Sequence, residues 1–383
     1  MTARQLHSYP VYFGAPLARP FASILNSRQS RMPCGSDSWV INTIAAVKDV
    51  VARGFTVLTS IEMNTWELVI WAVNELGGKQ IIVYPFYSGT EPKAFVDRIT
   101  RDFELDLKRT GFLFFETDKP TSRPKLAWPD RDALILRESE FVYPISVRNN
   151  GNISALLRDY KSAKKVNRDY VVNYQKKRGI EVLIPNKEEV ERRFSGEKWN
   201  YLTHWTRTFY GPWPGETSRD YYSAIVNSEG DYPRSGFESL INIIRNMKIA
   251  GSGWHIREGM AAVSFTSLSL PGATELMKYR SRWGRYTFEP YGIAIDKEAA
   301  EHCGIRPVIY GDSKLYDSLD DKDRPYFQSS GTRGDWKAER EYRFIGDLDL
   351  RSLPERSMRM IVPGQDECEK VSAITDIEAI VLS

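Results

Sequence analysis

The sequence predicts a protein of two parts, an α/β N-terminal domain and an α+β C-terminal domain. A chain of 383 residues exceeds the usual size of a single hydrophobic core. Short apolar strands alternate with amphipathic helices in the first part, which favours a parallel sheet. Many short strands and few helices follow in the second part, which favours a mostly antiparallel sheet. We expect domains at 1–147 and 199–383, joined by a basic linker or connecting helices at 148–198.

The N-terminal domain is expected to alternate strictly between strands and helices. In chain order, we expect a strand at 21–29, a helix at 38–53, a strand at 55–60, a helix at 64–77, a strand at 79–85, a helix at 91–109, and strands at 111–115 and 133–136. This order implies right-handed crossovers between parallel strands. Ligands of such sheets bind beyond the carboxyl ends of the strands, here the loops at 26–35 and 60–67.

The C-terminal domain is expected to contain one clear amphipathic helix, at 237–248. The expected strands lie at 201–207, 261–270, 286–296, 306–311, 340–346 and 357–363. The stretch WKAEREYRF at 336–344 belongs to the fifth of these strands. Alternation along a strand would place Glu339, Glu341 and Arg343 on one face, so that two carboxylates stand side by side.

Residues 148–193, between the two domains, are basic. They include twelve Lys or Arg and six Asp or Glu, with Tyr160, Tyr170 and Tyr174 interleaved. Two interpretations stay open, a solvated helical linker and a patch that contacts phosphates. A second basic and aromatic cluster at 279–286 contains Arg280, Arg282 and Arg285, and it is either a ligand-binding loop or a solvated one.

Composition sets limits on the class of protein. The net charge of +3 does not require a nucleic-acid or membrane partner. The three cysteines, Cys34, Cys303 and Cys368, are far apart, so neither a disulfide framework nor a metal site is expected. The N-terminus lacks the apolar region of a signal peptide, and no apolar run approaches the ~20 residues that span a bilayer. We therefore expect a cytoplasmic protein without a membrane partner.

Two loops of the N-terminal domain have the composition of a nucleotide site. The loop SRQSRMPCGSDS precedes a helix, and backbone amides at a helix N-terminus attract anions. At the next helix, a hydroxyl and a carboxylate are placed to hold phosphate and ribose. The candidate nucleotide-binding residues are Ser27, Arg28, Gly35, Ser36, Thr65 and Glu67.

Residues 8–115 resemble the SLOG superfamily, the Rossmann-like group that includes the DprA proteins and the LOG-type nucleotide phosphoribohydrolases. The resemblance rests on LNSRQSRMPCGSDSW, GFTVLTSIEMNTWEL and GGKQIIVYP. It implies a domain that binds a nucleotide or nucleic acid. The LOG signature Gly-Gly-Gly-x-Gly-Thr-x-x-Glu is replaced here by residues 61–67, which lack its glycines.

Three segments of the C-terminal domain, at 202–207, 263–266 and 336–344, follow one another in an order that resembles the ADP-ribosyltransferases. The resemblance implies NAD as the cofactor. It assigns ribose and amide contacts to His204 and Thr206, and nicotinamide stacking to Phe265. In such a reaction a carboxylate stabilises the oxocarbenium-like transition state, and a second carboxylate activates the acceptor. The implied catalytic residues are Glu341, His204 and Glu339, and the implied cofactor-binding residues are Thr206, Phe265, Thr266 and Arg285.

The same domain also resembles a family seen among bacterial abortive-infection proteins. The matching motifs are VSFT at 263–266, YGIAI at 291–295, GIRPVIY at 304–310 and WKAEREYR at 336–343. The leading hypothesis is therefore an antiphage effector whose N-domain senses nucleotide or nucleic acid and whose C-domain transfers ADP-ribose from NAD. One alternative is a non-enzymatic protein that binds single-stranded nucleic acid. Another is a phosphoribohydrolase that uses Glu67.

Overall fold

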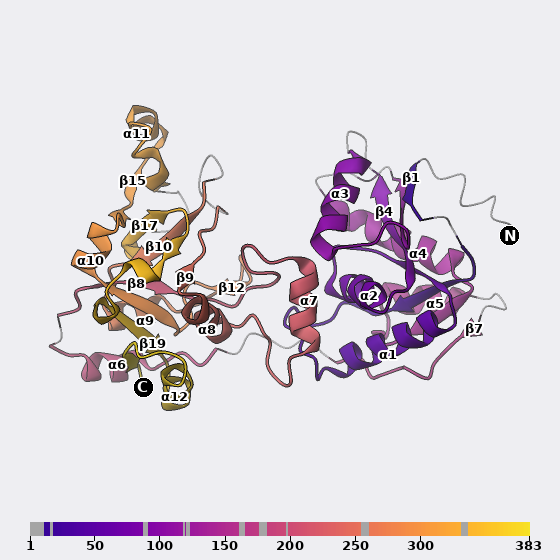
Figure 1. The fold of residues 1–383 in the computed structure, drawn as a ribbon, viewed down its shortest axis with the longest axis horizontal. Coiled ribbons are helices and arrows are strands. Elements are labelled where there is room, and N and C mark those ends of the chain that lie inside the picture. Colours follow the sequence, from indigo (N-terminus) through magenta and orange to yellow (C-terminus); the bar gives the residue numbers. More distant parts are fainter. Residues whose placement is uncertain are drawn as a thin grey trace. The chain divides into compact units, whose positions relative to one another are not determined.

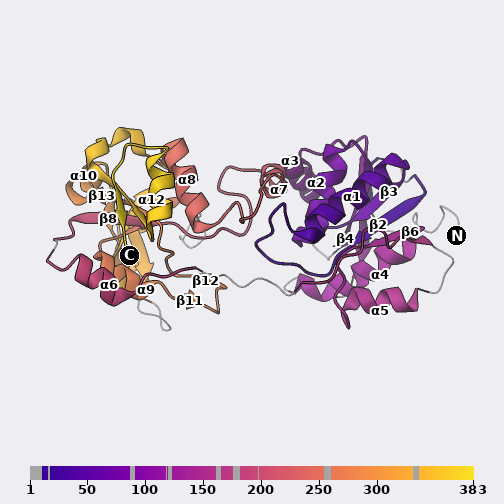
Figure 2. The same ribbon diagram turned by 90° about the horizontal axis from the view of Figure 1, so that it is seen from below.

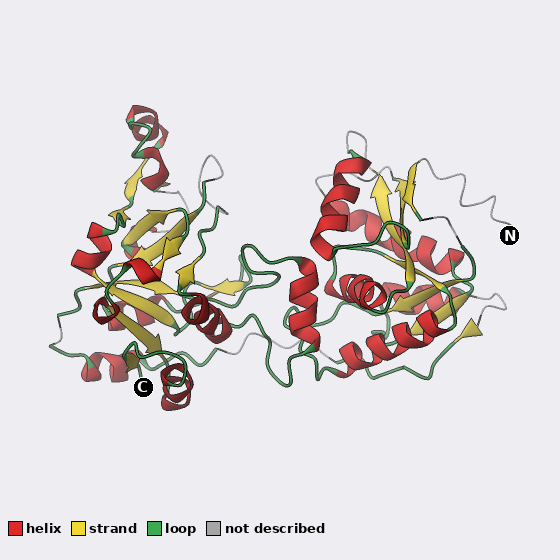
Figure 3. Cartoon of the chain, in the orientation of Figure 1, coloured by secondary structure: helices red, strands yellow, loops and turns green. Residues whose placement is uncertain are grey.

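The computed structural model describes residues 11–15, 18–86, 91–117, 119, 123–160, 165–175, 182–196, 198–253, 260–330 and 336–383. It divides the chain into two compact units, drawn in Figures 1 and 3. Unit 1 contains Met1–Arg178 and Gly215–Pro233, and unit 2 contains Gly179–Pro214 and Arg234–Ser383. The sequence-based ranges placed 215–233 in the C-terminal domain, whereas this segment packs within unit 1.

Unit 1 is built on a seven-stranded sheet of order β1-β5-β4-β3-β2-β6-β7. Its strands are β1 (Val11–Gly14), β2 (Phe21–Leu25), β3 (Thr56–Thr59), β4 (Lys79–Phe86), β5 (Thr110–Glu116), β6 (Phe141–Pro144) and β7 (Lys165–Val166). All neighbours pair in parallel except β1, which is antiparallel to β5. The predicted parallel sheet is thus confirmed, with β2 and β3 buried along their whole length because helices cover both faces.

Helices cover both faces of this sheet, as Figure 2 shows. One face carries α1 (Ser38–Ala52), α2 (Asn64–Glu75) and α3 (Pro92–Phe103), and the other carries α4 (Trp128–Glu138) and α5 (Asn152–Asp159). The sequence prediction of a strand at 133–136 was wrong. The apolar residues at 134–136 are buried positions of α4, because a short apolar run does not distinguish a strand from a buried helical turn.

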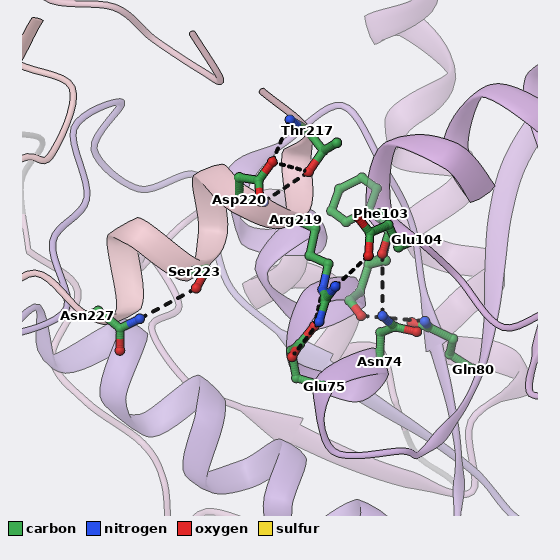
Figure 4. A network of polar contacts seen from close by, with 11 residues as sticks. Asn74, Glu75, Gln80, Phe103, Glu104, Thr217, Arg219, Asp220, Ser223 and Asn227 are labelled. Atoms are coloured by element: carbon green, nitrogen blue, oxygen red, sulfur yellow. Dashed lines mark hydrogen bonds and ion pairs between the residues drawn. The ribbon is translucent and has the colours of Figure 1, made fainter. Parts of the chain in front are cut away.

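Helix α7 (Ser218–Val226) belongs to the segment that returns to unit 1, and it packs against α2 and α3. Its Tyr221, Tyr222 and Ile225 are buried in the same apolar cluster as Phe103 of α3. Figure 4 shows the polar side of this contact, where Arg219 forms ion pairs with Glu75 and Glu104. A capping box between Thr217 and Asp220 starts the helix. The sequence analysis did not predict α7.

Unit 2 is built on a second seven-stranded sheet, of order β14-β17-β10-β8-β13-β19-β20. Its strands are β8 (Tyr201–Trp205), β10 (Ala262–Thr266), β13 (Gly292–Asp296), β14 (Arg306–Pro307), β17 (Glu341–Ile345), β19 (Met358–Val362) and β20 (Ala379–Val381). All pairs are antiparallel except β19 with β20. The predicted mostly antiparallel sheet is confirmed.

The two faces of the second sheet bury separate apolar clusters. On one face lie α8 (Gly236–Asn246), α10 (Lys297–His302) and α12 (Gln365–Ser372), and on the other lie α6 (Lys187–Arg193) and α9 (Leu270–Leu276), as Figure 2 shows. Leu202 and Phe265 point to the first face, and Trp205 points to the second. Alternation along β8 therefore separates His204, on the face of Leu202, from Trp205.

Shorter elements complete unit 2. The short strands are β9 (Lys248–Ile249) with β18 (Leu348–Asp349), β11 (Tyr279–Arg280) with β12 (Arg285–Tyr286), and β15 (Ile309–Gly311) with β16 (Phe327–Ser329). The short helices are α11 (Ser313–Ser318), η4 (Arg324–Tyr326), η5 (Trp336–Glu339), η6 (Leu350–Ser352) and η7 (Glu355–Ser357), and unit 1 has η2 (Pro124–Ala127).

The segment 336–344 is not a continuous strand. Trp336–Glu339 forms the 3-10 helix η5, Arg340 has a left-handed φ of 45°, and β17 starts only at Glu341. The sequence prediction that Glu339 and Glu341 share one strand face was therefore wrong. Of the basic segment between the domains, 161–164 and 176–181 lie outside the described residues.

Candidate functional site

Four charged side chains of unit 2 lie close enough to interact through their charges. We call Arg207, Arg285, Glu339 and Glu341 the charged cluster. Arg207 follows β8, Arg285 lies in β12, Glu339 ends η5, and Glu341 begins β17. Each is partly buried, and Arg207 and Glu339 each interact through charge with the other three. Four segments that are distant in sequence therefore meet at one place.

The register of the strands explains why Glu341 and Arg207 lie on the same face of the sheet. Thr266 of β10 lies opposite Glu341 of β17 and Thr203 of β8, and residues opposite one another share a face of the sheet. Thr203, Trp205 and Arg207 continue that face at every second residue. The predicted site residues Glu341 and Thr266 thus belong to the same face as Arg207, which the sequence analysis did not select.

Glu341 is held by hydrogen bonds from the chain itself. Arg343 Nε lies 2.9 Å from Glu341 Oε1, and Arg343 Nη2 lies 3.2 Å from Oε2. The hydroxyl of Ser264 also donates to Oε1, at 2.7 Å. Arg343 is buried and donates further to Gln328 and to the carbonyls of η4 and β16. Both oxygens of Glu341 therefore complete a structural network that joins β10, β17 and β16.

Glu339 is held differently. The hydroxyl of Thr266 donates to its backbone carbonyl and fixes the end of η5 beside β10. Burial raises the pKa of the Glu339 carboxyl above its ordinary value, and the neighbouring Glu341 raises it further. Arg207 and Arg285 act in the opposite sense. These neighbours affect the carboxylate through charge, and no described residue donates a hydrogen bond to it.

The two arginines of the charged cluster are kept partly out of water. Burial and, to a smaller extent, the nearby Arg285 lower the pKa of Arg207 to about 10, although Glu339 opposes the shift. Burial also lowers the pKa of Arg285. Two like charges in a desolvated place favour a bound anion, because an anion would relieve their repulsion. The cluster therefore combines two partly buried cations with a carboxylate to which no described side chain donates a hydrogen bond.

His204 and Phe265 come together, but on the opposite face of the sheet. Their ring centroids lie 5.7 Å apart in an edge-to-face arrangement. His204 Nδ1 lies 2.9 Å from the carbonyl oxygen of Ser264. Burial lowers the pKa of the imidazole to about 4, so the ring is neutral near pH 7, with an N–H that donates to this carbonyl. His204 thus contacts β10 on the face of the sheet opposite to Glu341.

The loop after β8 is anchored by a buried carboxylate. Glu289 accepts hydrogen bonds from the amide of Thr208, at 2.8 Å, and from its hydroxyl, at 3.0 Å. The hydroxyl of Thr206, a predicted cofactor contact, donates instead to the carbonyl of Gly236, at 2.7 Å. Both contacts fix the backbone on either side of Arg207, so the charged cluster rests on a rigid support.

The hairpin of β11 and β12 brings exposed aromatic and basic residues to the same unit. Tyr279 and Trp283 are each about half exposed, at 49% and 48%. Arg282 lies over the Trp283 ring, at 5.5 Å from its centroid. Arg280 lowers the pKa of Glu339, which places this hairpin next to the charged cluster. Exposed rings of this kind stack well on bases and on nicotinamide.

In unit 1, Glu67 is enclosed by the returning segment. The hydroxyl of Tyr222 donates to Glu67 Oε2 at 2.7 Å, and the amide of Glu62 donates to Oε1 at 3.0 Å. Burial raises the pKa of the Glu67 carboxyl, although both donors counteract this shift. A carboxylate with both oxygens occupied inside a packed contact is part of the architecture of unit 1.

The other predicted nucleotide-binding residues of unit 1 do not form a single open pocket. The Gly35 amide donates to Ser228 Oγ at 3.0 Å, and carbonyls at the end of α7 leave no space for a side chain there. Ser27 Oγ accepts from the amide of Arg148, and Ser36 Oγ lies 3.3 Å from Cys34 Sγ. Thr65 is buried, and its hydroxyl has no partner among the described residues. Of these residues, Arg28 and Ser36 are exposed.

Arg28 belongs to a group that the sequence analysis missed. We define the Trp128 cluster as Trp128, Arg28, Lys125, Arg131 and Glu62. The three cationic groups lie 5.3, 5.7 and 5.4 Å from the centroid of the indole ring. Trp128 Nε1 donates to Glu62 Oε2 at 3.0 Å. Arg28 and Glu62 belonged to quoted motifs, but no periodic pattern brings 125–131 next to the loops after β2 and β3.

Comparisons with known proteins leave the family undefined. No protein-family model matches the sequence, and no curated protein matches it. Among solved structures, the molybdenum cofactor carrier protein of Chlamydomonas reinhardtii is 15% identical, over 39% of this chain and 75% of its own, with a TM-score of 0.25. DNA processing protein A of Helicobacter pylori, described with its single-stranded DNA binding mode, is 14% identical, over 44% and 71%, with a TM-score of 0.29. Likenesses this weak carry no argument about function.

Two searches over the described part of the chain gave negative results. No group of three or more His, Cys, Asp or Glu side chains there is arranged to hold a metal ion. No helix there is both long and apolar enough to cross a membrane.

Proposed function

We propose that unit 2 binds NAD at the charged cluster and transfers its ADP-ribose to an acceptor. The observation that carries this proposal is the grouping of Arg207, Arg285 and Glu339, whose charges act on one another. Two partly buried arginines suit a pyrophosphate, and the exposed rings of the β11–β12 hairpin suit a base or nicotinamide. The carboxylate of Glu339 accepts no hydrogen bond from any described residue, and it suits a developing positive charge.

In the proposed reaction, the bond between the nicotinamide nitrogen and ribose C1′ breaks, and its electron pair leaves with neutral nicotinamide. A hydroxyl of the acceptor, or water, then forms a bond to the oxocarbenium carbon. The proton of that hydroxyl passes to the carboxylate of Glu339, whose raised pKa makes it a better base than an ordinary carboxylate. This scheme gives Glu339 alone the two carboxylate roles that the sequence analysis divided between Glu339 and Glu341.

The test is to incubate the protein with NAD and measure released nicotinamide and labelled ADP-ribose. We expect release by the unmodified protein, and none by Glu339→Gln. The matched control is Glu355→Gln, because Glu355 is an exposed glutamate of the same unit outside the charged cluster. Intact NAD, with no labelled protein, DNA, RNA or free ADP-ribose, contradicts the proposal.

We extend the proposal to an antiphage effector role. Its support is the resemblance to abortive-infection proteins, whose motifs fall here on β10, β13, β14 and the start of β17, which are strands of one sheet. Cells that produce the protein are expected to reduce phage plaque counts, and cells that produce Glu339→Gln are not. Equal plaque counts with the protein, the variant and an empty vector contradict this role.

We propose a second function for unit 1, which is to bind single-stranded nucleic acid or a free nucleotide. The supporting observation is the exposed Arg28 in the loop after β2, at the edge where parallel sheets bind ligands. A fluorescent oligonucleotide and labelled mononucleotides are the probes. Absence of binding to both at low salt contradicts this function.

A further inference from the structure

The Trp128 cluster stands at the edge of unit 1 where a ligand of a parallel sheet is expected. Arg28 lies in the loop after β2, Glu62 in the loop after β3, and Lys125 and Trp128 in the segment that leads into α4. Both loops leave the carboxyl ends of their strands. Residues from three separate segments thus surround one indole ring, although no single motif contains them.

The ring is held in place by fixed partners. Trp128 Nε1 donates to Glu62 Oε2, and Tyr84 donates its hydroxyl proton to Glu62 Oε1, at 2.7 Å. Glu62 has a φ of 75°, a left-handed backbone that a residue with a side chain adopts at a cost. Arg131 is buried against the ring and donates to the carbonyl of Ile61, at 3.1 Å. The indole is therefore preorganised by its own hydrogen bond and by its neighbours.

The other two cations differ from Arg131 in a way that matters for binding. The side chains of Arg28 and Lys125 are exposed, and neither forms a described ion pair. Long exposed side chains can leave the ring to meet a phosphate at little cost, because water already solvates their charges. A preorganised ring with two adjustable cations is suited to a base that stacks while its phosphate is neutralised.

We propose that the Trp128 cluster binds one nucleotide unit, with the base stacked on Trp128 and its phosphates held by Arg28 and Lys125. This inference rests on the nucleic-acid or nucleotide binding proposed for unit 1, and it names the site and the ligand chemistry. A free nucleotide and a nucleotide within a single strand both present this chemistry. The enclosed residues Gly35 and Glu67 take no part in it.

The experiment measures binding of fluorescent oligothymidylate and of labelled AMP to the full chain, over a range of salt concentrations. We expect Trp128→Ala to weaken binding about 5- to 150-fold, which corresponds to the loss of one stacked base at ~1–3 kcal/mol. Trp128→Phe keeps a stacking ring and is expected to retain most of the affinity. Equal melting temperatures of the two variants show that the difference does not arise from unfolding.

The cations are tested through the salt dependence. For a single strand, each phosphate contact contributes about −0.7 to the slope of log affinity against log salt, so Lys125→Gln and Arg28→Gln are each expected to flatten the slope by about 0.7. Lys48→Gln and Arg98→Gln are the matched controls, since both remove exposed cations of unit 1, and Arg98 also lies beside an aromatic ring. The controls are expected to leave the slope unchanged.

The outcomes separate the site from the function. Binding to neither probe overturns the proposed function of unit 1 and this inference together. If the affinity of Trp128→Ala stays within twofold of that of the unmodified protein, this inference alone is overturned. Equal binding of heparin, which has no bases, also overturns it, because the patch then recognises only anions. Competition of AMP with the oligonucleotide identifies the free nucleotide as a ligand, and binding of the oligonucleotide alone identifies the strand.

Discussion

Two buried carboxylates, Glu67 of unit 1 and Glu339 of unit 2, have raised pKa values for the same first reason, which is burial. Their surroundings differ. Glu67 accepts one hydrogen bond on each oxygen from Tyr222 and Glu62, whereas the described neighbours of Glu339 act on its carboxylate through charge alone. A carboxylate whose donors are supplied by the fold stabilises the fold, and one that lacks donors is available to a ligand. Glu341, with Arg343 and Ser264, belongs to the first kind.

The largest expected effect on stability comes from removing the carboxylate of Glu341 from its hydrogen-bond network. Glu341→Ala leaves the guanidinium of Arg343 buried without its carboxylate, so we expect the free energy of unfolding to fall by about 3–5 kcal/mol. Denaturant unfolding, followed by a signal from unit 2, measures it. The matched control is Glu341→Leu combined with Arg343→Met, which removes both charges and is expected to recover most of the loss. A loss below about 1 kcal/mol for the single variant would contradict the structural role of Glu341.

The next effect concerns the contact that holds α7. Tyr222→Phe removes a hydrogen bond to a buried carboxylate, and such bonds contribute about 1.5–3 kcal/mol. The control is Tyr221→Phe, whose hydroxyl meets the neutral hydroxyl of Tyr232 at 3.0 Å and is expected to cost about 1 kcal/mol. Hydrogen exchange of the α7 amides locates the loss. Equal losses in the two variants would show that Glu67 is not charged in this contact.

A third, smaller effect is a dependence of stability on pH that arises from His204. Its folded-state pKa of about 4 lies below the ordinary 6.5, so between these values the unfolded chain binds a proton that the folded chain does not. Stability is therefore complete above pH 6.5 and falls as pH decreases towards 4. For this half-buried ring we expect a loss of about 1 kcal/mol by pH 5, after allowing for solvent screening.

His204→Gln is the control for this pH dependence, because an amide can donate to the Ser264 carbonyl but does not titrate. Melting temperatures of both proteins from pH 7 to pH 5 make the comparison. Parallel curves for the two proteins would mean that His204 is protonated in the folded state.

The elements with strong periodicity were predictable from sequence, and the contacts between distant segments were not. The strands β3 and β4 and the helices α1, α2 and α8 lie close to their expected ranges. Helix α7 escaped prediction, because nothing in the sequence of 215–233 shows that its apolar residues fill a core formed by 1–178. Glu339 was selected for its spacing from Glu341, but the left-handed Arg340 breaks the alternation on which that argument depended.

The partners of each site residue were the least predictable feature. The sequence offered Glu341 as a catalytic group, and only strand pairing shows that Ser264 and Arg343 converge on it. Likewise, the Thr65 to Glu67 motif suggested a nucleotide site, although a helix about 150 residues later encloses Glu67. Local patterns define elements, whereas the neighbours of a carboxylate depend on the topology of the whole chain.

The smallest effect on stability is expected at Glu339, and it is the most informative. Because burial and Glu341 hold its pKa above the ordinary value, the ionised group contributes no stability near neutral pH. Glu339→Gln should therefore leave the free energy of unfolding within about 0.5 kcal/mol of the original. The same variant should lose NAD cleavage while it still binds NAD, because Arg207 and Arg285 remain. Isothermal titration with NAD and calorimetric unfolding of one preparation test both expectations. A large loss of stability would move Glu339 into the class of Glu67 and remove the main support for a catalytic role.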